Sequence, residues 1–303
     1  MKKRAVSSLL ASLALVSLIL PALAADAPEL EETPPPGEET VAWAPFHLDG
    51  APQQSVEYET RNGVTYATVG SFVSMLDPEA VVEEENGAAT VNAARVSEVV
   101  DAEGNTATVV EETLSLTVKA GASYIVANGR YLYAKGSLIL LNNSVAAPVR
   151  LLAQVFNLDV GYDGATRTVL LNHREGDAYL TPGDSYYDAD TLYWLSRIIH
   201  AESGNQILDG KIAVGNVVMN RVESPKFPNN IYDVLYQKNQ FGPASSGSLK
   251  RTPNEESVIA AKLVLDGAEV VPTALFFNRA GLSCYASRNR TYVTTIGEHA
   301  FYA

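Results

Sequence analysis

The chain has 303 residues, 47% of them hydrophobic, and a net charge of −13, a length that suits two domains of ordinary size. Residues 25–190 contain 26 Asp and Glu against 8 Lys and Arg, whereas residues 191–303 contain 9 against 11. The acidic N-terminal half argues against nucleic acid as a partner, because phosphates need a basic surface. The lone Cys284 excludes an intramolecular disulfide, so we expect folding to depend on packing.

Residues 1–24 have the layout of a signal peptide. Lys2, Lys3 and Arg4 precede an apolar run that ends at Ala22-Leu23-Ala24, a small-residue cleavage site. The run is short for a membrane span, although an uncleaved anchor is the alternative. Residues 25–44 are rich in Pro and Glu and predict a flexible linker. We therefore expect a secreted protein that works outside the cytoplasmic membrane.

Residues 45–175 contain the same β-rich unit twice. The first copy reads VTYATVGSFVSML and then AVVEEENGAATVNA; the second reads SVAAPVRLLAQVF and then LDVGYDGATRTVLLN. Each copy predicts a strand, a helical turn and a hairpin. The hairpin turns fall on Asn86-Gly87 and Asp163-Gly164, dipeptides that supply the positive φ values of a tight turn.

This duplicated unit, over residues 47–172, resembles the copper-amine-oxidase-like N-terminal domain. The likeness is carried mainly by ANGRYLYAKGSLILLNNSVAAPVRLLAQVFNLDVGYDGATRTVLLN. No copper chemistry follows from the name, since His47 is isolated and no ligand set surrounds it. The resemblance implies a module that attaches to the cell-wall polymer, or a stalk that acts as a spacer.

A second domain is predicted at 191–303, after a linker at 176–190 that contains Pro182-Gly183-Asp184. Its first helix has Asp188, Asp190 or Thr191 as candidate caps and ends at Gly204, and its second covers 210–222. Four further elements are predicted: a helical turn at 232–236, a helix opened by a capping box at Thr252-Pro253-Asn254-Glu255, and two strands at 274–277 and 292–296.

Glu202 is the main candidate catalytic residue. It continues the apolar stripe of Leu195, Ile198 and Ile199 along the first helix, so its carboxylate should be partly desolvated. Desolvation and the negative end of the helix dipole both raise the pKa of a carboxyl group. A carboxyl that is protonated near neutral pH is what a general acid requires. The alternative is a surface glutamate at a fraying helix end.

The run AESGNQILDGKIAVGNVVMNRVESPKFPNNIYDVLYQKNQF resembles the SleB-type cell-wall hydrolases, which include spore cortex-lytic enzymes. The likeness continues through TPNEESVIAAKLVLDG, ALFFN and TTIGEHAFYA and covers residues 192–303. It implies an α+β chain in which the duplicated β-rich module precedes a mainly helical, lysozyme-like catalytic domain with a small sheet. It also implies that Glu202 is catalytic and that the substrate is the peptidoglycan glycan strand, with an accessory germination or wall protein as a further partner.

The reaction implied is lytic transglycosylation at the bond between N-acetylmuramic acid and N-acetylglucosamine. A hydrolytic muramidase or glucosaminidase needs two carboxyl groups, and the nearest other acids, Asp209 and Glu223, are predicted at helix ends. The remaining alternatives are a cell-wall amidase and a non-catalytic wall-binding accessory protein. No cofactor or metal is predicted, since the four histidines are scattered and HExxH is absent.

The predicted substrate-binding residues are Gln240, Phe241, Asn278, Tyr285 and Tyr292. Gln240 and Phe241 belong to a predicted loop with an aromatic suited to a sugar groove, and Asn278 follows a buried strand. For each of these, an ordinary turn or loop residue is the competing interpretation.

The first prediction concerns export. We expect cleavage after Ala24 or Ala25, so the mature protein should be recovered outside the cytoplasmic membrane with a new N-terminus. N-terminal sequencing of the secreted protein tests this. Recovery of a chain that begins at Met1 and stays in the membrane fraction would contradict it.

Overall fold

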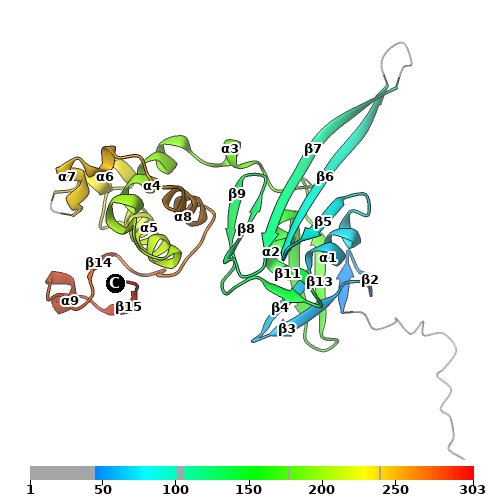
Figure 1. Cartoon of the computed structure of the whole chain (residues 1–303), viewed down its shortest axis with the longest axis horizontal. Coiled ribbons are helices and arrows are strands. Elements are labelled where there is room, and N and C mark those ends of the chain that lie inside the picture. The colour runs from blue at the N-terminus through cyan, green and yellow to red at the C-terminus, as the bar shows by residue number, and fades with distance from the viewer. Residues whose placement is uncertain (1–44, 101–105, 177, 239) are drawn as a thin grey trace, which may run out of the picture. The chain divides into compact units, whose positions relative to one another are not determined.

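The computed structural model describes residues 45–100, 106–176, 178–238 and 240–303, which belong to one compact unit. The predicted signal peptide and the linker that follows it lie outside the described residues. The fold is α+β, with a β-rich N-terminal half and a mainly helical C-terminal part that carries one small sheet (Figure 1). The predicted fold class is confirmed.

The N-terminal half contains thirteen strands and two helices among the described residues. Their bounds, in chain order, are β1 (Phe46–Leu48), β2 (Ala51–Gln53), β3 (Tyr58–Arg61), β4 (Val64–Thr68), α1 (Val69–Leu76), β5 (Val81–Glu85), β6 (Ala88–Val100), β7 (Thr106–Lys119), β8 (Tyr124–Ala127), β9 (Arg130–Tyr133), β10 (Ile139–Leu141), β11 (Ser144–Pro148), α2 (Val149–Val155), β12 (Leu158–Asp163) and β13 (Thr168–His173).

The predicted duplication has a direct structural counterpart. The first copy folds as β4, α1, β5 and β6, and the second as β11, α2, β12 and β13. The equivalent strands β4 and β11 pair antiparallel, which places the two copies side by side in the sheet β10-β11-β4-β3. The other sheets of this half have the orders β12-β13-β1-β2 and β5-β6-β7-β8-β9.

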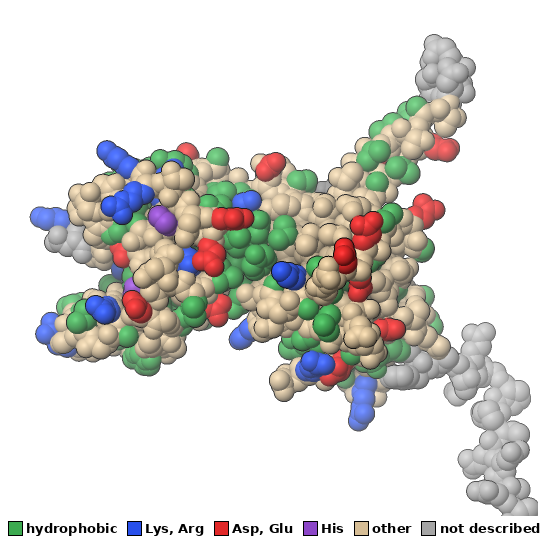
Figure 2. Space-filling model, in the orientation of Figure 1, with side chains coloured by type: hydrophobic (Ala, Val, Ile, Leu, Met, Phe, Trp, Pro, Cys, Tyr) green, Lys and Arg blue, Asp and Glu red, His purple; other side chains and the backbone are tan. Residues whose placement is uncertain are grey.

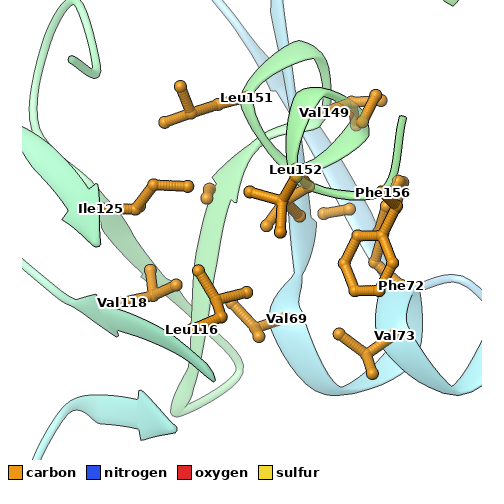
Figure 3. Packing of buried hydrophobic residues seen from close by; sticks show 14 of the residues in the cluster. Val69, Phe72, Val73, Leu116, Val118, Ile125, Val149, Leu151, Leu152 and Phe156 are labelled. Carbon is orange, nitrogen blue, oxygen red and sulfur yellow. The ribbon is translucent and has the colours of Figure 1, made fainter. Parts of the chain in front are cut away.

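Helices α1 and α2 meet in the core of this module. Phe72 of α1 and Phe156, just after α2, lie 6.3 Å apart between ring centroids, and Figure 3 shows them facing each other. Leu116 from β7 and Ile125 from β8 lie in the same cluster and are fully buried. Each copy therefore contributes one helix to a single apolar core, and neither copy encloses a core alone.

One of the two predicted hairpin turns is correct. Asn86 and Gly87 both have positive φ, 52° and 73°, as a two-residue primed turn requires. At the second hairpin the left-handed residue is Arg167, with φ of 59°, and Gly164 does not have positive φ. The reason is a longer loop in which the Asp163 carboxylate accepts hydrogen bonds from the Ala165 amide and the Thr166 hydroxyl.

The C-terminal part is built mainly from helices. Its elements are α3 (Gly183–Tyr186), α4 (Ala189–Ser203), α5 (Leu208–Glu223), α6 (Ile231–Tyr236), α7 (Gly242–Ser246), a 3₁₀ turn (Ser248–Lys250), α8 (Glu255–Leu265), β14 (Phe276–Arg279), α9 (Tyr285–Asn289), β15 (Tyr292–Ile296) and β16 (His299–Tyr302). The three strands form a sheet in the order β14-β16-β15. None of the helices among the described residues combines the length and apolarity needed to cross a membrane.

Two local predictions in this part need correction. The cap of α8 is Asn254, whose side chain accepts from the Ser257 amide, so Pro253 precedes the cap and Thr252 is not the capping residue. The strand expected at 274–277 is β14, two residues later, because the Ala274 amide closes a turn onto Val271. The predicted loop of Gln240 and Phe241 is short, because the helix α7 begins at the next residue, Gly242.

The β-rich module and the helical part are joined by a buried ion pair. Arg130 of β9 donates to the carboxylate of Asp266 at the end of α8, and neither side chain is more than 8% exposed. The hydroxyl of Tyr187 donates to the same carboxylate. Nearby, Tyr133 of β9 donates to Asp209 of α5 at 3.1 Å. These contacts connect the two parts through polar groups that are buried or partly buried.

Replacement of Arg130 should therefore destabilise the whole unit. Arg130→Leu leaves the Asp266 carboxylate buried without its cation, and we expect the free energy of unfolding to fall by about 3 kcal/mol. Arg61→Leu is the matched control, since Arg61 pairs with Glu59 at the surface, with 45% and 39% of the side chains exposed. That control should cost less than about 1 kcal/mol. Urea denaturation measures the free energy of unfolding of both variants. An equal loss of stability in the two variants would contradict the prediction.

Candidate active site

Helix α4 carries the candidate catalytic residue in its last turn. The helix begins after Asp188, whose carboxylate accepts from the Thr191 amide at 2.8 Å, and it is capped at its C-terminus by Gly204. Leu195, Ile198 and Ile199 are fully buried. The predicted apolar stripe and both helix ends are confirmed, and Glu202 lies where this stripe reaches the end of the helix.

Glu202 combines partial burial with the lack of a partner. Across the described residues, no hydrogen bond or ion pair involves its carboxyl group, and its side chain is only partly exposed. Burial raises the pKa of Glu202, because the charged form loses hydration without gaining a compensating contact. The group is thus placed to hold a proton at a higher pH than an ordinary glutamate, as the sequence predicts.

The segment after Glu202 is held by a network that the sequence analysis did not identify. The Oε1 atom of Gln206 accepts from the Glu298 amide at 2.9 Å, in the turn between β15 and β16. Lys211, 1% exposed, donates through Nζ to the Gln206 carbonyl and, at 2.6 Å, to Glu256 of α8. The available signal was a lysine within the apolar run of α5. This network fixes the end of α4 against α5, α8 and the sheet.

Close packing against α5 and α8 also helps to fix the position of α4. Gly215 on α5 faces α4 and α8, where a Cβ atom would lie 2.8 Å from Val264 Cγ2 and 3.0 Å from Ile199 Cδ1. A larger residue would push α5 away from α4, so this glycine permits the close approach of the two helices. On the other side of α4, His200 accepts through Nδ1 from the Asn254 amide at 3.3 Å and is thereby tied to the start of α8.

The predicted binding residues Gln240 and Phe241 have different environments. Gln240 is exposed, but Phe241 is 5% exposed and packs in the helical core, 6.4 Å from Phe277 between ring centroids. The Phe241 ring is covered by its own core, and its role in sugar binding stays a prediction. Its position holds the backbone of the Gln240 loop.

Arg221 is the residue that connects this loop to the sheet. It is 4% exposed, donates through Nε to the Leu275 carbonyl at 2.7 Å, and lies 4.8 Å from the Phe241 centroid and 5.3 Å from that of Phe276. Burial lowers its pKa to about 10. Arg221 is thus a buried hydrogen-bonding residue of the domain interior.

The other three predicted binding residues lie on or beside the small sheet. Asn278 is partly buried on β14 and accepts from the Arg279 amide at 2.7 Å. Tyr285 and Tyr292 are 60% and 58% exposed, on α9 and β15. Within the described part of the chain, no hydrogen bond or ring contact joins any of the three to Glu202. Their role in binding stays a prediction.

Four further titratable groups either contact other parts of the fold or lie exposed at a helix end. Asp209 is engaged by Tyr133, and Glu223 is the exposed last residue of α5. Burial lowers the pKa of His299, whose ring packs against Phe277 at 5.3 Å. Cys284 caps α9 through the Ser287 amide, and this hydrogen bond lowers its pKa. No three His, Cys, Asp or Glu side chains in the described ranges are grouped to hold a metal ion.

Two protein families match separate parts of the chain. Residues 205–302 match the Cell Wall Hydrolase family, and residues 88–171 match the family of the copper amine oxidase N-terminal domain. Both resemblances read from the sequence are confirmed over these ranges. The first match begins at Asn205, so Glu202 lies three residues before it.

Curated relatives and a solved structure each match between 38% and 42% of the chain. The spore cortex-lytic enzyme of Bacillus cereus is 28% identical over 116 residues, which are 38% of this chain and 45% of that protein. The spore cortex-lytic enzyme of Bacillus subtilis is 25% identical over 129 residues, which are 42% of each chain. The chain thus spans less than half the length of these relatives. The catalytic domain of the germination-specific lytic transglycosylase SleB from Bacillus anthracis is 25% identical, covers 41% of this chain and 100% of that domain, and has a TM-score of 0.37.

The raised pKa of Glu202 makes a prediction about stability. A carboxyl whose pKa is raised by folding destabilises the folded state once the pH exceeds the unfolded value of 4.5. Glu202→Gln removes this ionisation, so the variant should be more stable than the parent at pH 7.5, by at most about 1.4 kcal/mol for each unit of pKa shift.

Below pH 4.5, Glu202 is mostly protonated in both the folded and the unfolded chain and is nearly as neutral as the glutamine of the variant. The difference in stability between the two proteins should then nearly vanish. Denaturation at pH 7.5 and pH 4 measures it, with Glu223→Gln at the exposed end of α5 as the matched control. A Glu202→Gln variant that is less stable than the parent at pH 7.5 would contradict the prediction.

Proposed function

We propose that this protein is an exported peptidoglycan-cleaving enzyme that acts as a lytic transglycosylase on the bond between N-acetylmuramic acid and N-acetylglucosamine. One observation carries the proposal: Glu202 is a partly buried, unpartnered carboxyl with a raised pKa at the end of a firmly packed helix. The matches to the Cell Wall Hydrolase family and to spore cortex-lytic enzymes support the choice of substrate.

Glu202 performs both proton transfers. In its protonated form it donates to the glycosidic oxygen, the bond from that oxygen to the muramyl C1 breaks, and the neighbouring acetamido group stabilises the positive charge that develops at C1. The muramyl C6 hydroxyl then attacks C1, and its proton passes to the Glu202 carboxylate. A 1,6-anhydro ring forms, the acid is regenerated, and neither water nor a cofactor is consumed.

A single-carboxylate mechanism agrees with the positions of the other acids. Hydrolysis normally requires a second carboxylate across the scissile bond. Asp209 is occupied by Tyr133, and Glu223 lies exposed at the far end of α5. Glu298 is the acid whose backbone is tied to the segment after Glu202, through Gln206. Glu298 is therefore the candidate second carboxylate for the alternative function, a hydrolytic muramidase.

The β-rich module serves as the attachment or spacer unit of the enzyme. It contains a cavity of about 340 Å³ between β7 and the segment that leads to α3. The cavity is lined by Glu111, Glu112, Thr113, Asn128, Tyr179, Leu180, Thr181 and Pro182. The Asn128 amide of this lining already donates to the Thr113 and Leu180 carbonyls, and the Tyr179 hydroxyl donates to Asp77, so attachment and spacing stay two alternatives for this module.

The decisive test uses Glu202→Gln on purified peptidoglycan. The variant keeps shape and hydrogen bonding but cannot transfer the proton, so the rate of release of soluble fragments should fall at least ~10²–10⁴-fold with folding intact. Glu223→Gln is the matched control and should keep full activity. Full activity of Glu202→Gln would remove the basis of the proposal.

Mass spectrometry of the released fragments separates transglycosylation from hydrolysis. The parent enzyme should give anhydro-muropeptides, and Glu298→Gln should leave both rate and products unchanged. Reducible muramic ends, together with a loss of at least ~10²-fold in Glu298→Gln, would instead establish a hydrolase with two carboxylates. Release of stem peptides without glycan cleavage would indicate an amidase.

A further inference from the structure

Four aromatic residues on α4 and α6 form a surface cluster that is not part of the proposed chemistry. We call it the aromatic platform; its members are Tyr193, Trp194, Tyr232 and Tyr236. The three tyrosines are 44%, 48% and 44% exposed, while Trp194 is partly buried and packs on the helical core. Single exposed tyrosines are ordinary, but a contiguous aromatic surface marks a place where another molecule binds.

The rings of the platform are held in fixed orientations. Tyr232 and Tyr236 are one turn apart on α6 and stack with centroids 4.5 Å apart and an interplanar angle of 29°. Trp194 meets them edge-on at 5.3 and 6.0 Å, and Tyr193 meets Trp194 at 5.0 Å. Because each ring is braced by a neighbour, little side-chain freedom remains to be lost when a ligand binds.

A cation without a carboxylate partner borders the platform. The Arg197 guanidinium carbon lies 3.6 Å from the Tyr193 ring centroid, and its Nη1 donates to the Tyr193 carbonyl at 3.4 Å. In the parts of the chain that the structure describes, Arg197 forms no ion pair, and its buried Nε has no hydrogen-bond partner. A guanidinium stacked on an aromatic ring in this way is available to a carboxylate of a ligand.

We propose that the aromatic platform, with Arg197, is a second glycan-binding site that holds a peptidoglycan strand away from the reacting bond. The apolar C–H faces of pyranose rings pack on exposed aromatic rings, and the free guanidinium complements the carboxylates of wall peptides. Nucleotides and other phosphate polymers are disfavoured as occupants, because among the described residues only Arg197 places a cation against these rings. The inference rests on the proposed function for the identity of the polymer.

The position of the platform on α4 explains why it is separate from catalysis. Trp194 precedes Glu202 by eight residues, which corresponds to about 12 Å along a helix and to a rotation of about 80°, so the two residues are separated mainly along the axis of α4. A ligand on the platform therefore contacts the enzyme without contacting the Glu202 carboxyl. A second contact of this kind raises the apparent affinity for a long polymer, whereas a short fragment that fills only one site gains nothing.

The test compares binding to insoluble peptidoglycan in the full-length Glu202→Gln background, where cleavage does not remove the polymer. Adding Tyr232→Ser and Tyr236→Ser should weaken co-sedimentation at least about tenfold, since two of the stacking faces are lost. Tyr186→Ser is the matched control, because Tyr186 is 44% exposed on α3, outside both the platform and the β-rich module, and it should change nothing. Tyr232→Ser alone should give an intermediate loss, and thermal denaturation verifies that each variant is folded.

A second measurement uses the active enzyme with the same substitutions on a short soluble glycan fragment. The kcat/KM for this fragment should stay within about twofold of the parent value, while the rate on insoluble peptidoglycan falls. Unchanged binding of the double variant, or equal loss on the soluble fragment, would overturn the inference. A parent that binds peptidoglycan through the platform but releases no fragments would leave the inference standing and refute the proposed function instead.

Discussion

Gln206 makes the contact on which the position of the candidate acid depends. Its side chain accepts from the turn between β15 and β16, and its carbonyl accepts from the buried ammonium of Lys211. The same ammonium contacts Glu256 on α8. One glutamine therefore joins two helices and the sheet at the point where α4 ends. A carboxyl group can remain unpartnered beside such a network only because the surrounding backbone is fixed by other groups.

The unpaired carboxyl of Glu202 differs from those buried charged groups of the protein that have partners. Two other buried charges among the described residues are compensated: Asp266 has Arg130 and Tyr187, and Lys211 has Glu256. Glu202 is the exception among the described acids whose pKa is shifted, because burial raises its pKa while hydrogen bonds lower those of the others. A local penalty of this kind, surrounded by satisfied polar groups, is typical of a functional position.

Sequence periodicity predicted the elements well where the signal was local. The apolar stripe of α4 and the Asn86-Gly87 turn depend on residues within a few positions of one another, and both were correct, while the cap of α4 is Asp188, one of the three candidates. The errors arose where several local solutions compete, as at the Asp163 loop and the start of α8. The Gln206 network and the Arg130–Asp266 pair join residues far apart in sequence, so periodicity contains no information about them. Burial of Phe241 belongs to the same class, since it depends on Arg221 and the sheet.

The parallel pairing of β1 with β13 has a consequence for the order in which the module acquires its structure. Phe46 lies opposite Val169, and the ring of Phe46 is fully buried. The first strand of the module thus completes its hydrogen bonds only with the last one. Contacts between such distant segments close late, because the intervening chain must first lose its conformational entropy. A nascent chain that has not yet reached residue 173 holds its first strand without its main partner, so the duplicated module cannot be complete before its second copy is.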